Sequence, residues 1–192
     1  MTLRARQEEA MKTALLIVDI QNDYFPGGKM ELEGSVAASK KAGTLLSGFR
    51  AQQLPIIHIQ HVSVQPGATF FLPNTPGVEI NENVTPLAAE IVFQKNFPNS
   101  FRQTPLLDCL KQNNVEQLVI AGMMTHMCID ATTRAAFDYG FRCRLAHDAC
   151  ATRALTFGGK LVPAEFVHNS FVSALHGIYA NALTTDELLA NL

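Results

Sequence analysis

The chain has 192 residues, of which 47% are hydrophobic and 17% are charged, and its formal net charge is −2. These proportions are typical of one folded domain with a sizeable core, and they exclude a disordered chain. Its 15 basic and 17 acidic residues form no long run of one sign, so we predict neither nucleic acid nor a membrane surface as a partner.

The cysteines and the N-terminus bear on where the protein is found. The four cysteines lack the close pairwise spacing of a zinc site, and no secretory signal precedes them. The apolar run at 14–18 is too short to span a bilayer. We therefore expect reduced thiols, a cytoplasmic protein and a single domain over residues 1–192, with residues 1–12 as an N-terminal extension. The cysteines are Cys109, Cys128, Cys143 and Cys150.

Strands and helices are predicted to alternate along the chain. Apolar runs predict strands at 14–18, 55–60, 90–94, 115–121, 141–146 and 178–180. Amphipathic stretches predict helices at 35–52, 105–112, 126–139 and 163–176, and a last helical turn at 185–190. Alternation implies parallel pairing through right-handed crossovers. We expect a three-layer α/β/α domain with a mainly parallel, Rossmann-like sheet of about six strands.

Proline and glycine mark several of these boundaries. Pro105 and Pro163 are each placed at the first position of a helix. Gly122 should stop the fourth strand, and Gly140 should close the third helix. The pair of glycines at 158–159 is predicted to form a turn.

Two long loops follow strands, at 21–34 and 62–86. In open α/β sheets the ligand site lies at the C-terminal ends of the strands, where both loops begin. We interpret them as pocket walls and lids because they carry aromatic side chains. The chain has no G-x-G-x-x-G, P-loop or G-x-S-x-G pattern, so it does not indicate a nucleotide site or a serine hydrolase. The aromatic residues are Tyr24, Phe25, Phe70 and Phe71.

Three reactive residues stand where apolar strands end: Asp19, Lys95 and, after a short turn, Cys128. All such ends lie at one edge of a parallel sheet, so an acid, a cation and a thiol should converge there. Each alone has an ordinary explanation. The Asp could cap a loop, the Lys could be solvated, and the Cys could be a small core residue.

The surroundings of Cys128 favour chemistry. With Thr125 as N-cap, Cys128 falls in the first helical turn, where free amides and the helix dipole should lower the thiol pKa. Asp19 is then the candidate base and Lys95 its electrostatic partner. On the same helix Ala131 and Ala135 should pack closely against the sheet.

Three sequence blocks stand in a fixed order along the chain: Val18–Phe25, Lys95 with Ser100–Phe101, and Ala121–Cys128. Together they resemble the isochorismatase-like cysteine hydrolases, over residues 13–180. The resemblance implies a triad of Cys128 as nucleophile, Asp19 as base and Lys95 as partner. It also implies a non-proline cis peptide between Met123 and Met124, and an oxyanion hole made by the amides of Met124 and Cys128.

Departures from the family pattern narrow the expectation. Metal-dependent nicotinamidases of the family carry Asp-x-His after the second strand, where this chain has Gln60–Ser63 without a carboxylate, so we expect no metal and no other cofactor. His58 and His61 should face opposite sides of their strand, and His61 is interpreted as a pocket residue. Isochorismatases proper generally lack the cysteine, so Cys128 favours amide chemistry. The stretch 122–128 is also similar to the streptothricin hydrolase subgroup.

The sequence therefore predicts a hydrolase that cleaves a C–N bond of a small amide through a thioester. One alternative is vinyl-ether hydrolysis with Asp19 as acid and Cys128 incidental. Another is a non-catalytic binding domain on the same fold. The resemblance also implies a homodimer or larger assembly. Asp148 and Cys150 are predicted to lie just past the end of the fifth strand. The expected substrate-binding residues are Gln21, Tyr24, Phe25, His61, Phe70, Phe71 and Thr125.

Overall fold

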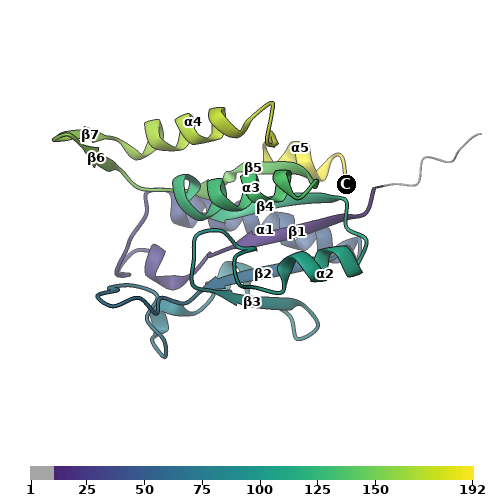
Figure 1. The fold of residues 1–192 in the computed structure, drawn as a ribbon, viewed down its shortest axis with the longest axis horizontal. Coiled ribbons are helices and arrows are strands. Elements are labelled where there is room, and N and C mark those ends of the chain that lie inside the picture. The colour runs from purple at the N-terminus through teal and green to yellow at the C-terminus, as the bar shows by residue number, and fades with distance from the viewer. Residues whose placement is uncertain (1–10) are drawn as a thin grey trace, which may run out of the picture.

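The computed structural model describes residues 11–192, and residues 1–10 of the expected N-terminal extension lie outside the described residues. Its centre is a six-stranded sheet in the order β3-β2-β1-β4-β5-β8, in which every neighbouring pair is parallel (Figure 1). The strands are β1 Thr13–Val18, β2 Ile56–His61, β3 Ile91–Lys95, β4 Gln117–Met123, β5 Arg142–Ala151 and β8 Asn181–Leu183.

Helices cover both faces of this sheet. One face packs against α1 and α5, and the other against α2, α3 and α4. In Figure 1, α1 lies behind the strands, while α2 and α3 lie in front of them. The predicted three-layer α/β/α class is thus confirmed. The helices are α1 Ser35–Ala51, α2 Leu106–Gln112, α3 Asp130–Asp138, α4 Ala164–Leu175 and α5 Thr185–Leu189.

Strand β1 shows why an unbroken apolar run belongs at the centre of such a sheet. Successive side chains of a strand point to opposite faces. Leu15 and Ile17 accordingly join the core under α1, whereas Leu16 and Val18 join the core under α2 and α3. Both faces are covered, so every position of this strand is buried, and its chemistry begins only at the next residue, Asp19.

Glycine at position 122 permits the close approach of β4 to β1. Gly122 has a φ of 138° and pairs with Val18, whose backbone occupies the space that a Cβ would need. Any side chain there would push the two central strands apart. Gly122 is not the end of β4, which continues to Met123, so the predicted boundary is short by two residues.

The helix predicted at 126–139 consists of two segments of different helix type. A π-helical turn, Thr125–Ile129, precedes α3, and Gly140 follows the helix with a φ of 91°, as predicted. The wider turn changes the phase of the helix. As a result Thr132, Thr133 and Ala136 are buried on α3, and the predicted close-packing residues Ala131 and Ala135 are only half-buried.

Other differences concern the C-terminal third. The last strand is β8, a few residues after the predicted 178–180. Strand β5 continues past 146 because its pairing with β4 shifts register between Ile120 and Gly122, so Asp148 and Cys150 belong to the strand. The turn at 158–159 is confirmed, and it joins a hairpin that was not predicted, β6 Leu155–Phe157 with β7 Lys160–Val162. In Figure 1 this hairpin projects from the body at the upper left.

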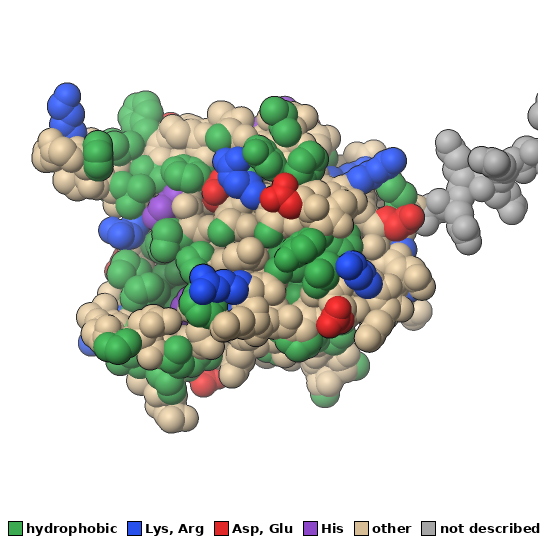
Figure 2. All heavy atoms as spheres, in the orientation of Figure 1, with side chains coloured by type: hydrophobic (Ala, Val, Ile, Leu, Met, Phe, Trp, Pro, Cys, Tyr) green, Lys and Arg blue, Asp and Glu red, His purple; other side chains and the backbone are tan. Residues whose placement is uncertain are grey.

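The helix starts at proline differ by one residue from the prediction. Pro105 and Pro163 stand at the N-cap positions of α2 and α4, immediately before the first helical residue. All four cysteines are free thiols. No helix among residues 11–192 has the length and apolar character needed to cross a membrane. Figure 2 shows basic and acidic side chains intermingled on the face over α2 and α3.

Candidate active site

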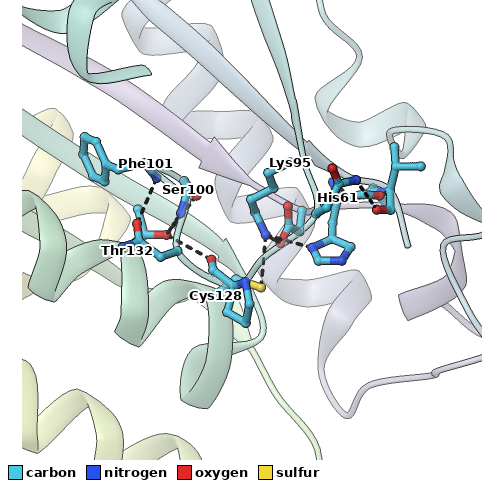
Figure 3. A network of polar contacts seen from close by, with 12 residues as sticks. His61, Lys95, Ser100, Phe101, Cys128 and Thr132 are labelled. Carbon is cyan, nitrogen blue, oxygen red and sulfur yellow. Dashed lines mark hydrogen bonds and ion pairs between the residues drawn. The ribbon is translucent and has the colours of Figure 1, made fainter. Parts of the chain in front are cut away.

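Four adjacent strands each bring one reactive side chain to the same edge of the sheet. Lys95 ends β3, His61 ends β2, Asp19 follows β1, and Cys128 follows β4 after the turn. His61 and Lys95 are paired in register across β2 and β3. Figure 3 shows the side chains of His61, Lys95 and Cys128 pointing toward one another. The structure therefore brings together the three residues of the predicted triad and adds His61.

The Lys95 ammonium lies at the centre of this group. It is 2.6 Å from Asp19 Oδ2, 3.1 Å from His61 Nδ1 and 3.3 Å from Cys128 Sγ. An ammonium has three N–H donors, and these contacts use all of them. Burial by itself would lower the pKa of Lys95, but Asp19 and Cys128 together hold the pKa above its ordinary value. Lys95 is accordingly a fixed cation.

Asp19 is fully buried, and only one of its two carboxylate oxygens has a hydrogen-bond partner among the described residues. Its backbone has a φ of 53°, in the left-handed region that non-glycine residues seldom adopt and that is often found at functional sites. Lys95 binds Oδ2, whereas Oδ1 is enclosed and has no hydrogen-bond partner among the described residues. A buried carboxylate oxygen without a donor is costly to keep. This oxygen is therefore open to a hydrogen-bond donor.

Cys128 does not have the low pKa that the sequence suggested. Its exposed fraction is only 4%. Burial, followed by the negative charge of Asp19, raises the pKa of the thiol well above its usual range, and Lys95 offsets this only in part. The predicted lowering of the thiol pKa is therefore wrong, because burial and the charge of Asp19 outweigh the effect of Lys95.

The turn before α3 leaves the amide of Met124 free. This N–H, at the N-cap position of the turn, donates to no acceptor within residues 11–192. The amides of Met127 and Ile129 instead bond to the carbonyl of Met124. The bond between Met123 and Met124 is cis, as the resemblance implied. An unengaged N–H at this turn is the kind of donor that an oxyanion would need.

Thr125 does not cap the helix. The N-cap position is Met124, and the Thr125 hydroxyl lies 3.3 Å from the carbonyl of Ala151 and 3.0 Å from Nδ1 of His168 on α4. Thr125 is fully buried, so this side chain anchors the turn to β5 and α4. The contact with His168 was not expected from the sequence, because nothing in the spacing of α4 places it beside the turn.

Gln21 is fully buried, and its amide group is engaged by the backbone. Its Nε2 donates to the carbonyls of His61 and Val78, at 2.9 and 2.7 Å, and its Oε1 accepts from the N–H of His61 at 2.7 Å. This leaves the side chain no N–H for a substrate. The structure thus places Gln21 behind His61, as the residue that fixes its backbone.

Aromatic residues from both long loops form a wall beside His61. The ring of Phe71 lies 4.5 Å from that of Tyr24, 5.0 Å from that of Phe70 and 6.0 Å from that of His61. Tyr24, Phe25 and Phe71 are buried in the core under α1, while Phe70 is half-buried. Phe70 is accordingly the aromatic residue of this wall with surface still free.

Asp23 links the two long loops through hydrogen bonds, a role that was not predicted from the sequence. Its Oδ2 accepts the N–H of Phe71 at 2.6 Å, and its Oδ1 accepts the N–H of Lys29 at 3.2 Å. A Cβ at position 77 would occupy the space of this carboxylate, so Gly77 is required there. The presence of an Asp in the block 18–25 was the available signal. Its partner Phe71 lies 48 residues away along the chain, so the contact could not be read from the local pattern.

A group that could hold a metal ion coincides with this centre. Ligand atoms of Asp19, His61 and Cys128 lie within 4.8 Å of one another. Carboxylate, imidazole and thiolate together suit zinc. However, the Lys95 ammonium contacts all three side chains, so a metal ion would have to displace it. The residues present therefore fit Lys95 as their cation better than a metal.

The remaining candidates lie outside this centre. His58 lies three residues before His61 on the opposite face of β2, as the strand periodicity predicted, and it contacts Glu90 at 2.9 Å. Asp148 accepts from the amide and hydroxyl of Thr185 at the start of α5. Cys143 is buried in β5, as predicted. None of these side chains reaches the triad.

Comparisons with known proteins place this geometry in a family. The Isochorismatase domain model matches residues 13–160. The isochorismatase family protein YddQ of Bacillus subtilis (strain 168) is 51% identical over 179 residues, which are 93% of this chain and 99% of YddQ. A crystal structure from Oleispira antarctica, assigned as an isochorismatase hydrolase, has a TM-score of 0.90 at 47% identity and covers 99% of both chains.

Two further relatives have names that state a reaction. Streptothricin hydrolase of Streptomyces noursei is 36% identical over 72% of this chain and 54% of its own length. Maleamate amidohydrolase of Pseudomonas putida is 29% identical over 74% of this chain and 73% of its own length. The family model and YddQ are sufficient to define the class. This chain belongs to the isochorismatase family.

Proposed function

We propose that this protein is a cysteine-dependent hydrolase that cleaves the C–N bond of a small amide through a thioester intermediate. The single observation that carries the proposal is the buried carboxylate of Asp19. One of its oxygens lies within 4.8 Å of the Cys128 sulfur, Lys95 binds Oδ2, and Oδ1 has no partner among the described residues. Relatives named streptothricin hydrolase and maleamate amidohydrolase support the reaction class.

The first half of the reaction forms the thioester. The Cys128 S–H proton passes to Asp19 as the sulfur attacks the carbonyl carbon. The N–H groups of Met124 and Cys128 receive the negative charge that develops on the carbonyl oxygen. The tetrahedral intermediate then collapses, the C–N bond breaks, and Asp19 returns the proton to the leaving nitrogen.

The second half releases the acid. Asp19 takes a proton from water as the water oxygen attacks the thioester carbon. The C–S bond then breaks, and the sulfur recovers its proton from Asp19. Lys95 remains charged throughout and keeps Oδ2 occupied, so that only Oδ1 exchanges protons. The raised pKa of Cys128 fits this scheme, since the thiolate is formed only when a carbonyl is present to be attacked.

The test is acylation of one thiol among four. Brief exposure to a panel of small primary and cyclic amides, followed by mass spectrometry of the digested protein, should find an acyl adduct on Cys128. Cys128→Ala should abolish both the adduct and turnover. Cys109→Ala is the matched control because Cys109 is the half-exposed cysteine, and it should change neither. Full turnover by Cys128→Ala would overturn the proposal.

The assembly and the location of the protein stay predictions. A homodimer or larger homo-oligomer is expected, and light scattering of the purified protein measures it. A cytoplasmic location is expected, and cell fractionation measures it.

A further inference from the structure

We infer that His61 is a specificity-determining residue. Its Nε2–H group would donate a hydrogen bond to a second oxygen of the substrate, beside the amide that is cleaved. The inference rests on the proposed function and extends it to the class of substrate, namely a small amide that carries another carbonyl or carboxylate oxygen.

The tautomer follows from the contact with Lys95. The ammonium has donors only, so His61 Nδ1, 3.1 Å away, must accept the hydrogen bond and cannot itself carry a proton. A neutral imidazole has its one proton on the other nitrogen. Protonation of both nitrogens is opposed by burial and by the positive charge of Lys95, which lower the pKa of His61 to about 4. His61 thus has a fixed acceptor on one side and a fixed donor on the other.

The donor side has no partner among the described residues. Nε2 of His61 makes no hydrogen bond to residues 11–192, and it is not among the enclosed polar atoms, so solvent or a ligand reaches it. The ring stands next to Phe71, and Phe70 beyond it has free surface. Nδ1 of the same ring is 3.1 Å from the Lys95 ammonium, which is 3.3 Å from Cys128 Sγ, so this accessible donor lies near the sulfur that an amide would approach.

The ring is held at both its side chain and its backbone. Lys95 fixes Nδ1, and Gln21 clasps the N–H and the carbonyl of His61. Donors that bind a substrate oxygen are most selective when they are held rigidly before the substrate arrives, because an analogue without the oxygen leaves a polar group unpaired. Gln21 is accordingly a positioning residue for His61.

Two substitutions distinguish the role of His61 Nδ1 from that of His61 Nε2. In His61→Asn the amide oxygen can replace Nδ1 as the acceptor for Lys95, but no donor reaches the position of Nε2. In His61→Gln the longer side chain can place an N–H near the position of Nε2. His176→Asn is the matched control, because Nδ1 of His176 also accepts a hydrogen bond, in this case from the backbone N–H of Ala182 and away from the triad.

The kinetic experiment compares matched amides. The amide that the wild-type protein turns over fastest is paired with an analogue in which the group that carries the second oxygen is replaced by an apolar one. An example is acetoacetamide with butanamide, in which a methylene stands in place of the second carbonyl group. We expect wild type to prefer the oxygen-bearing amide by about 10-fold or more in kcat/KM. His61→Asn should reduce that ratio toward one, His61→Gln should retain part of it, and His176→Asn should leave it as in wild type. An unchanged ratio in His61→Asn would overturn the inference.

A second readout does not depend on activity. Nitrogen-15 spectra of histidine-labelled protein, assigned with His61→Asn, should show the Nε2–H tautomer. The Nδ1–H tautomer would overturn this inference and leave the cysteine mechanism standing. Absence of turnover and of a Cys128 adduct with every amide in the panel would instead refute the proposed function, and this inference with it.

Discussion

The ammonium of Lys95 and the carboxylate of Asp19 form an ion pair at 2.6 Å in which both side chains have an exposed fraction of 0%. Removing both charges from water costs several kcal/mol, so such a pair is poor evidence for stability. Removing one partner leaves the other charge buried and alone.

The first prediction concerns the stability of this pair. Lys95→Met and Asp19→Leu should each lower the free energy of unfolding by about 3–5 kcal/mol, because each leaves an uncompensated buried charge. The double variant should recover most of that loss while being inactive. Urea unfolding of the three variants measures the coupling. If the double variant lost as much as the two single variants added together, the pair would not be coupled.

The second prediction concerns the thiol. The charge of Asp19 raises the pKa of Cys128 and that of Lys95 lowers it. Asp19→Asn should therefore lower the pKa of Cys128 and speed its alkylation by iodoacetamide near neutral pH, whereas Lys95→Met should raise the pKa further and slow it. Ultraviolet absorbance of the thiolate, measured in a Cys109→Ala background, follows the titration. Opposite signs would show that Asp19 does not act on the sulfur.

The third prediction separates amide from vinyl-ether hydrolysis. Asp19→Asn removes the proton carrier that both reactions need, and it should lower kcat by about 100-fold or more in either case. Cys128→Ser should be nearly as damaging only if the sulfur is the nucleophile. Steady-state rates on an amide and on a vinyl ether decide the point. A Cys128→Ser variant active on the ether alone would favour the isochorismatase-type reaction.

The fourth prediction concerns the two long loops. Asp23→Asn replaces one of the oxygens that accept from Phe71 and Lys29 with an NH₂ group, so it should cost about 1–3 kcal/mol and loosen residues 62–86. Hydrogen exchange over that loop and urea unfolding measure the effects. Asp138→Asn at the exposed end of α3 is the control, and it should stay within about 0.5 kcal/mol of wild type.

The fifth prediction is a dependence of stability on pH. The pKa of His61 is lowered from 6.5 to about 4, so between these values the unfolded chain binds more protons than the folded one. Stability is then full above about pH 6.5 and falls as the pH drops toward 4, by ~3 kcal/mol at most from this group. His58, His126 and His168, whose pKa values burial also lowers, add loss of the same sign. In His61→Asn the loss over this range should be smaller. An equal loss would mean that His61 does not resist protonation.

Much of the site could be predicted because it depends on order along the chain. Apolar runs that end in Asp19 and Lys95, and a turn that leads to Cys128, place these residues at one edge whenever the strands are parallel. The resemblance supplied the cis bond. For these features the local pattern was sufficient, whereas the oxyanion role of the Met124 and Cys128 amides stays a prediction.

Only the tertiary structure decided how the groups act. Gln21 was expected at the substrate, yet its amide is used by the backbone of His61, 40 residues away. Cys128 was expected to have a lowered pKa, yet burial and the charge of Asp19 raise it. The protonation of a group and the hydrogen bonds open to it depend on which neighbours exclude water, and those neighbours come from distant strands and loops. Sequence by itself determined which residues meet at the sheet edge, and packing determined their charge, their partners and the acceptor role of His61 Nδ1.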